Sequence, residues 1–241
     1  MECPALSIKR LINLKYPKIN TLWKRDEKNK FNIIEGDFSC LEFDAIKRWH
    51  ITEKIDGTNI RVYFNPIPNT IEFKGRTDEA DIPKFLLEAL DEIFTTKKLL
   101  EVFPKGKEIV LYGEGYGNKI QSDGKKYRED NSFILFDVVV DGWWLERKNV
   151  EDIAKKLEID VVPSLGTRTI PEIVSLVKGT FPSAISKQIL NSEGIVARSE
   201  PLMLFRDGSP IMWKLKSKDY LKLERTLSQK NKKEVRHSSH T

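Results

Sequence analysis

The stretch 51-ITEKIDGTNIRVYF-64 alternates apolar and polar residues on both sides of a short break at Gly57. Alternation with a period of two is typical of β-strands that bury one face. The stretch therefore predicts two strands that are joined through the break. Lys54 stands at the end of the first strand, with the carboxylates of Glu53 and Asp56 beside it in the chain. Such a lysine is either a solvated strand-end cation or a nucleophile, and the rest of the chain has to separate the two.

The composition is that of a globular protein. A chain of 241 residues can form one large domain or two small ones, and 39% hydrophobic residues suffice for a buried core. No apolar run reaches the length of a membrane span, and the first residues lack the apolar core of a signal peptide. With two cysteines, no disulfide framework or zinc cluster is implied. We therefore expect an intracellular protein without a membrane partner, with the cytoplasm as the default location.

The charge balance is mildly basic. Lysine and arginine number 41 against 36 aspartate and glutamate residues, which gives a net charge of +5. This excess suits a partner that carries phosphates, but charge alone does not identify one.

The apolar patterns alternate irregularly between strands and helices. Hairpin-linked strands of this kind predict largely antiparallel sheets and the α+β class. Residues 1–30 give no clear pattern. We expect strands at 49–55, 59–65, 70–76, 107–117, 193–199 and 210–217, a hairpin at 132–147, and helices at 82–100, 148–157 and 170–178.

Lys54 heads a series of short motifs. By average composition the tetrapeptide Lys-x-Asp-Gly occurs by chance in roughly one in twenty chains of this length, so alone it says little. Lys214 and Lys216 are alternate residues and share one face of a strand, with Trp213 and Leu215 on its buried side. In chain order the motifs are KIDGTN with Lys54 and Asn59, GRTD with Arg76, LYGEGYG with Glu114, FILFDV with Phe136, SEGIVAR with Glu193, and MWKLKS with Lys214 and Lys216.

This ordered set resembles the covalent nucleotidyltransferases, which comprise ATP-dependent DNA and RNA ligases and GTP-dependent mRNA capping enzymes. The resemblance extends over about residues 49–217. The chain resembles the RNA ligase 2 family and the RNA-editing ligases most, because they favour asparagine five residues after the lysine, as at Asn59. DNA ligases and capping enzymes usually carry arginine at that position. Those RNA ligases often have histidine where this chain has Asp56. The aspartate at this position is a feature that the chain shares with DNA ligases.

The resemblance implies both a fold and a reaction. The fold is a nucleotidyltransferase (adenylation) domain over residues 1–225, with two antiparallel sheets flanked by helices, ATP in the cleft between them, and a basic tail at 226–241. In the reaction, Lys54 attacks ATP, expels pyrophosphate and becomes lysyl-AMP. The AMP then passes to the 5′-phosphate of a nucleic acid end, and a 3′-hydroxyl displaces it to seal the strand, as in RNA repair.

Roles for individual residues are also implied by the resemblance. Phe136 would stack on the adenine, Ile195 or Val196 would close its other face, and Glu53 would read the base edge. An aromatic residue in an apolar strand is usually a core residue, so this alternative stays open for Phe136, although the motif series favours the stacking role. By the same resemblance, Glu114 would hold the ribose or take part in metal binding, and Glu193 would bind the metal. Asn59 and Arg76 would contact the phosphates and the incoming 5′ end. Lys214 and Lys216 would contact the α-phosphate.

Elementary chemistry agrees with these roles. A lysine amine in water has a pKa of about 10.4 and is protonated at neutral pH. Neighbouring cations disfavour its charged form and help to expose the lone pair. Two lysines on one strand face suit the charge that develops on a phosphate. Mg²⁺ (or Mn²⁺) would be held mostly by water and one or two carboxylates.

Three alternatives to an RNA ligase remain. Only 25 residues follow Lys216 (241 − 216), too few for the oligonucleotide-binding barrel of DNA ligases and capping enzymes or the helical domain of many RNA ligases. This favours a compact RNA ligase that acts on nicked or single-stranded RNA, with an accessory subunit as a further partner. The alternatives are a minimal ATP-dependent DNA ligase, an mRNA capping guanylyltransferase, and a non-catalytic RNA-binding relic of the fold.

Overall fold

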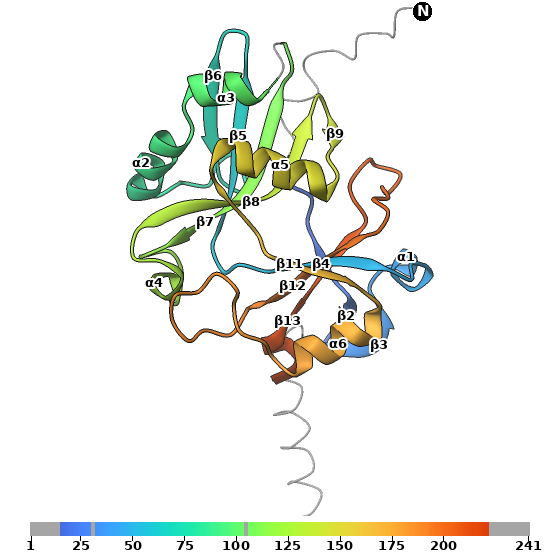
Figure 1. Cartoon of the computed structure of the whole chain (residues 1–241). Helices are drawn as coiled ribbons and strands as arrows, with labels where there is room; N and C mark the ends of the chain where they lie inside the picture. Colours follow the sequence, from blue (N-terminus) through green and yellow to red (C-terminus); the bar gives the residue numbers. More distant parts are fainter. Residues whose placement is uncertain (1–14, 30–31, 104–105, 222–241) are drawn as a thin grey trace, which may run out of the picture. The chain divides into compact units, whose positions relative to one another are not determined.

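The computed structural model describes residues 15–29, 32–103 and 106–221, and the structural statements below refer to these ranges (Figure 1). The expected tail at 226–241 lies outside them. The chain divides into two compact units. The described part of unit 1 consists of residues 15–17, 55–162 and 185–188, and that of unit 2 consists of the residues between 18 and 54, 163–184 and 189–221.

Unit 1 is built on a six-stranded sheet with the strand order β10-β8-β7-β5-β6, in which β9 pairs with β8. All its strand pairs are antiparallel except that of β10 with β8. The strands are β5 (Thr58–Asn65), β6 (Thr70–Lys74), β7 (Ile109–Gly117), β8 (Asn131–Val140), β9 (Trp143–Trp144) and β10 (Asp160–Val161).

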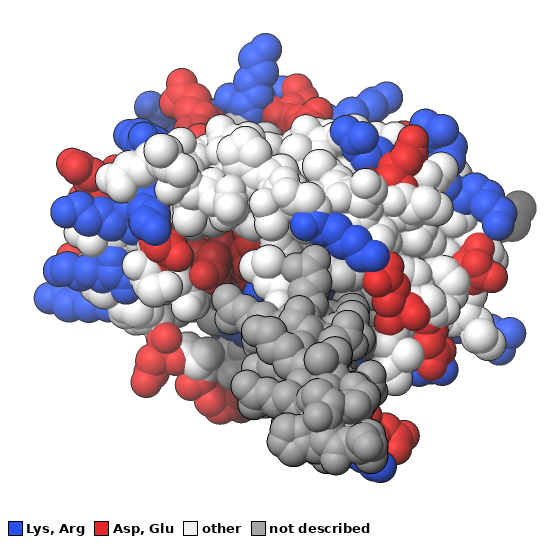
Figure 2. Space-filling view, turned by 90° about the horizontal axis from the view of Figure 1, so that it is seen from below, with Lys and Arg blue, Asp and Glu red and all other residues white. Residues whose placement is uncertain are grey.

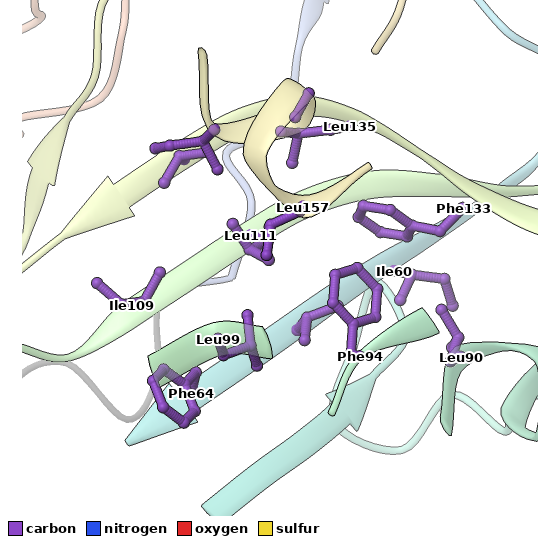
Figure 3. Packing of buried hydrophobic residues seen from close by; sticks show 14 of the residues in the cluster. Ile60, Phe64, Leu90, Phe94, Leu99, Ile109, Leu111, Phe133, Leu135 and Leu157 are labelled. Carbon is purple, nitrogen blue, oxygen red and sulfur yellow. The ribbon is translucent and has the colours of Figure 1, made fainter. Parts of the chain in front are cut away.

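Helices cover one face of this sheet. The helices of unit 1 are α2 (Lys84–Ile93), α3 (Thr96–Val102), α4 (Gly124–Tyr127) and α5 (Arg147–Leu157). Alternate residues of β5 point to the helices, so that Ile60, Val62 and Phe64 join one buried cluster with residues of α2, α3 and α5. Figure 3 shows the labelled side chains of this cluster, among them Leu90 of α2 and Leu157 of α5.

The single helix expected at 82–100 is two helices, so this prediction was wrong. Phe94 has extended dihedral angles (φ −107°, ψ 99°) and ends α2. Thr95 is the N-cap of α3, because its side chain accepts a hydrogen bond from the backbone N–H of Lys98. A threonine at this position needs non-helical dihedral angles, and the apolar spacing continues across the break without revealing it.

Unit 2 contains a five-stranded sheet with the order β1-β13-β12-β4-β11. The β1–β13 pair is parallel, and the other pairs are antiparallel. Its elements are β1 (Asn20–Thr21), the two-stranded sheet of β2 (Trp23–Arg25) and β3 (Ile33–Phe38), α1 (Leu41–Ala45), β4 (Trp49–Glu53), β11 (Ser164–Arg168), α6 (Ile170–Lys178), β12 (Gly194–Ser199) and β13 (Met212–Lys216).

The core of unit 2 lies on one face of the five-stranded sheet. Trp49 of β4 and Trp213 of β13 are fully buried, and their rings meet edge to face with centroids 5.4 Å apart. Ile173 and Val177 of α6 complete the same cluster. Leu215 is also fully buried, so the expected buried side of the β13 segment is confirmed.

The predicted α+β class with largely antiparallel sheets is confirmed. The strands β1, β2 and β3 arise in a region for which the sequence indicated no element. No helix in the described ranges has the length and apolar character needed to cross a membrane. Acidic and basic side chains are interspersed over the face of the molecule that Figure 2 shows, as the small net charge suggests.

We predict that Leu90→Ala destabilises the protein by about 2–5 kcal/mol, because the side chain is fully buried and its removal leaves a cavity. Urea denaturation measures the change in the free energy of unfolding. The matched control is Leu41→Ala, whose side chain is 88% exposed and should change stability by no more than about 0.5 kcal/mol. Equal effects of the two substitutions would contradict the described core.

Candidate active site

Lys54 follows β4 directly and is held in line with the sheet of unit 2. Its backbone N–H donates a 2.9 Å hydrogen bond to the carbonyl of Gly194, the first residue of β12. Gly194 in turn pairs with Lys216 of β13. Since residues two apart share a face of a strand, the side chains of Lys54, Lys216 and Lys214 leave the sheet on the face opposite the buried tryptophans.

The carboxylate of Glu193 joins two of these lysines. Its Oε2 accepts a 2.6 Å hydrogen bond from Nζ of Lys54, and its Oε1 pairs with Nζ of Lys216. The side chains of Lys54, Glu193 and Lys216 are only 18%, 11% and 20% exposed. Charge-assisted contacts that are shielded from water are stronger than those on an open surface. We call Lys54, Glu193 and Lys216 the lysine–glutamate cluster.

The cluster keeps Glu193 ionised. Burial raises the pKa of this carboxyl, but the charge of Lys54 and the hydrogen bonds from Lys216 and Lys54 outweigh it, so that the pKa lies below its usual value. At neutral pH the cluster therefore contains an anionic carboxylate, which can receive ammonium groups or a divalent cation.

Val196, not Ile195, accompanies the lysines. Val196 pairs with Lys214 on one side and with Thr52 on the other, which places it on the lysine-bearing face. The side chain of Ile195 is fully buried in the core with α6. Of the two residues expected to cover a nucleobase, the structure thus leaves Val196 available and corrects the choice of Ile195.

The side chain of Glu53 also points away from the lysine face. It is 1% exposed, and its Oε2 accepts a 2.9 Å hydrogen bond from the backbone N–H of Ala184. Burial raises the pKa of the carboxyl, against the opposing effect of hydrogen bonds from Ser183, Ala184 and Ser192. Glu53 therefore anchors the segment before β12, and a role in reading a base edge stays a prediction.

In unit 1, Asn59 and Glu114 face each other across neighbouring strands. They are direct cross-strand partners of β5 and β7. By alternation they lie on the sheet face that the helices leave uncovered, together with Arg61 and Tyr112. An atom of each, Oδ1 of Asn59 and Oε2 of Glu114, is buried. The sheet thus presents a carboxylate and an amide side by side.

Phe136 sits at an irregularity of β8. Leu135 pairs with Gly113 and Asp137 pairs with Tyr112, so Phe136 is the extra residue of a β-bulge. Its ring is half-buried and packs edge-on against Tyr16, with centroids 4.9 Å apart. The bulge turns Phe136 to the sheet face that carries Glu114, where it packs against a smaller apolar cluster that contains Tyr112, while the core residues of β8 face the helices.

The break after Lys54 is packed tightly inside unit 1. A Cβ on Gly57 would lie 2.5 Å from the carbonyl oxygen of Gly115, so only glycine fits there. The carbonyl of Gly57 accepts a 3.0 Å hydrogen bond from Nε2 of Gln121, and the N–H of Asp56 donates to the hydroxyl of Tyr127 at 3.4 Å. Sequence reasoning did not single out Gln121 or Tyr127, because both precede strand β8 in an unpatterned segment.

Arg76 lies in the loop after β6 with its side chain exposed. Within the described residues, no three His, Cys, Asp or Glu side chains gather into a metal centre. Glu193 and Glu114 each offer carboxylate oxygens, a donor chemistry that suits Mg²⁺ or Mn²⁺ completed by water and phosphate oxygens.

A family model described as RNA ligase matches residues 47–216, which is more than half of the chain and spans every motif from Lys54 to Lys216. The chain belongs to the RNA ligase family. The resemblance inferred from the ordered motifs is thereby confirmed, and with it the membership in the covalent nucleotidyltransferase superfamily.

Solved structures of RNA ligase from Naegleria gruberi share the fold of this RNA ligase family member. A mutant in the apo form matches with a TM-score of 0.58 at 20% identity, over 77% of this chain and 54% of that chain. Another mutant, bound to ATP and Mn, matches with a TM-score of 0.58 at 19% identity, over 86% of this chain and 61% of that chain. A third, bound to AMP and Mn, has a TM-score of 0.58, 21% identity and coverages of 86% and 63%.

The chain therefore spans less than two thirds of the length of the Naegleria structures that it matches. No curated protein sequence matches the chain significantly.

We predict that Lys54→Met raises the pKa of Glu193, because the strongest favourable charge is lost while burial remains. With a lowered pKa, the carboxyl contributes stability that is complete above its unfolded pKa and is lost as the pH falls through its folded pKa. Between about pH 7 and about pH 3 the stability of Lys54→Met should therefore fall less steeply than that of the native protein. Urea denaturation across this range measures the difference.

The matched control is Lys178→Met, which removes an exposed lysine paired with Glu35 at 2.6 Å in the same unit. It should retain the native pH dependence. An acid limb that is the same in Lys54→Met and the native protein would show that Lys54 does not hold the charge of Glu193.

Proposed function

We propose that the protein is an ATP-dependent RNA ligase, which joins 5′-phosphate and 3′-hydroxyl ends through lysyl-AMP and adenylated-end intermediates. The observation that carries the proposal is the lysine–glutamate cluster, in which the first lysine of the motif series meets the last lysine through one carboxylate. Lys54 and Glu193 are 139 positions apart in the chain, so sequence order alone does not bring them together.

In the first step, Nζ of Lys54 forms a bond to the α-phosphorus of ATP. The bond from that phosphorus to the bridging oxygen breaks, and pyrophosphate leaves with its electron pair. Nζ must first release a proton to solvent water, and the ionised carboxylate of Glu193 at 2.6 Å is placed to orient the amine for the attack. Lys216, with Lys214 on the same face, would neutralise charge on the α-phosphate.

Glu193 and Glu114 are the carboxylates that would hold Mg²⁺ or Mn²⁺. A bound divalent cation would supply charge neutralisation of the phosphate oxygens. The protein side chains would position the ligands of the cation. Glu193 is already held in place by the ammonium groups of Lys54 and Lys216. Naegleria structures with ATP and Mn support this choice of cofactors for the fold.

Each unit offers side chains that suit parts of a nucleotide. In unit 1, the half-exposed ring of Phe136 is suited to stack on adenine, and Asn59 with Glu114 can hydrogen-bond to ribose hydroxyls or phosphates. In unit 2, Val196 offers an apolar surface beside Lys214. Burial of Glu53 makes its backbone, rather than its carboxylate, the more suitable contact for the base edge.

In the second step, an oxygen of the 5′-phosphate of the polynucleotide attacks the phosphorus of lysyl-AMP, and the P–N bond breaks to return the amine to Lys54. In the third step, the 3′-hydroxyl attacks the activated 5′-phosphate and AMP leaves. The exposed Arg76 would bind the 5′-phosphate in these steps. The low cysteine count suits a reducing, cytoplasmic location, and an accessory subunit that binds the polynucleotide belongs to the same proposal.

We predict that incubation with α-labelled ATP and Mg²⁺ labels the native protein covalently, and that Lys54→Ala abolishes the label. Label that survives denaturation and disappears with acid treatment identifies the phosphoramidate bond. The control Lys47→Ala removes an exposed lysine seven residues earlier and should label normally. Labelling with GTP instead would indicate a capping guanylyltransferase, and the absence of any adduct would indicate a non-catalytic relic.

We predict that the enzyme seals a nick between RNA strands about tenfold faster, or more, than the same nick between DNA strands. The loss of one hydrogen bond to a 2′-hydroxyl accounts for about 1–1.5 kcal/mol, which corresponds to about tenfold. Gel analysis of matched nicked duplexes measures both rates. Faster sealing of the DNA nick would replace the RNA ligase proposal with a minimal DNA ligase.

A further inference from the structure

Arg61 of β5 is fully buried, which is unusual for its residue type. Its exposed fraction is 0%, and its strand neighbours Ile60 and Val62 belong to the apolar core on the other face of the sheet. Arginine is almost never buried completely unless it is paired, because removing its charge from water is costly. The contacts of the guanidinium therefore have to account for its position.

The guanidinium of Arg61 holds both ends of the loop that follows β6. Its Nε donates a 2.7 Å hydrogen bond to the carbonyl of Gly75, and an Nη donates a 2.8 Å hydrogen bond to Oδ1 of Asp78. The other Nη donates to the hydroxyl of Tyr63 at 3.0 Å. The rigid fork of an arginine can fix three acceptors in one plane, which a lysine cannot do.

Between these two anchors lies Arg76. Residues 75–78, which we call the anchored loop, begin directly after Lys74, the cross-strand partner of Arg61. Gly75 is buried, whereas Arg76 is exposed. Asp78 also pairs with Lys15 at 3.5 Å, and the hydrogen bond from Arg61 lowers the pKa of its carboxyl. The backbone on both sides of Arg76 is thus fastened to the sheet while its side chain reaches solvent.

We propose that Arg61 is a positioning residue, which fixes the anchored loop so that Arg76 meets the 5′-phosphate of the RNA end. This inference rests on the proposed function. Arg61 has no access to a ligand itself, since its side chain is fully buried and its donors are engaged within the protein. Its effect on the reaction therefore has to pass through the loop. A displacement of about 1 Å in a contact of this kind lowers a rate by up to about a hundredfold.

The test separates the first step from the use of the 5′ end. Arg61→Met keeps the apolar stem and removes the fork, and Arg61→Lys keeps the charge. For each full-chain variant, lysyl-AMP formation from ATP is measured first. Transfer of AMP from the isolated lysyl-AMP enzyme to a 5′-phosphorylated RNA is then measured in a single turnover. We expect lysyl-AMP formation within about twofold of the native rate, and end transfer reduced about ten- to a hundredfold in both variants.

The matched control is Arg147→Met in α5 of the same unit. Arg147 also bonds a backbone carbonyl, that of Val162 at 2.6 Å, and a carboxylate, that of Glu151 at 2.7 Å. It should cause a similar loss of contacts but leave end transfer unchanged. If Arg61→Met lowers the yield of folded protein, Asp78→Ala replaces it, since Asp78 is exposed, with Glu151→Ala as its control. We expect a loss of end transfer of a few-fold for Asp78→Ala alone.

A double-mutant cycle decides whether Arg61 acts through Arg76. If it does, Arg61→Met combined with Arg76→Ala transfers AMP no more slowly than Arg76→Ala alone, because the positioned group is already absent. Additive losses would overturn the inference, as would native end transfer in Arg61→Met and Asp78→Ala. Failure of the native protein to form lysyl-AMP would overturn the proposed function, and the inference with it.

Discussion

The pairing of one partly buried carboxylate with two ammonium groups constrains the rest of unit 2. Glu193 precedes β12, Lys54 follows β4, and Lys216 ends β13, so their contacts tie the ends of three adjacent strands together. Removing one member would leave an uncompensated charge in a partly desolvated place, which is strongly unfavourable. With Lys214 on the same face, three cations and one anion give a local charge of +2 (3 − 1), a natural setting for a phosphate.

Both units use the alternation of a β-strand in the same way. One face of each main sheet is sealed by an apolar cluster, and the other carries most of the motif side chains, in unit 1 beside a smaller apolar cluster around Tyr112. Ile60 and Arg61 show this division within two residues, since one enters the core and the other binds the anchored loop. Rigid strands thereby set the positions of groups such as Glu114, while the loops after them bring Arg76 to solvent.

Much of the fold followed from sequence patterns, and the exceptions have physical causes. Strands that bury one face are visible through alternation, and β4, β5 and β13 were predicted in this way. The short strand β1 has little pattern of its own and is defined by pairing with β13, nearly two hundred residues later in the chain. The break between α2 and α3 was missed because one capping threonine outweighs a continuous apolar spacing.

By itself the sequence determined the order and chemistry of the motif residues, the α+β class, and the shared strand face of Lys214 and Lys216. Only the tertiary structure decided that Ile195 is a core residue and Val196 is not, and that Arg61 is buried. The physical reason is that alternation states which residues share a face, whereas the packing of distant elements decides which face is covered. For the same reason, only the folded chain could bring Glu193 between Lys54 and Lys216.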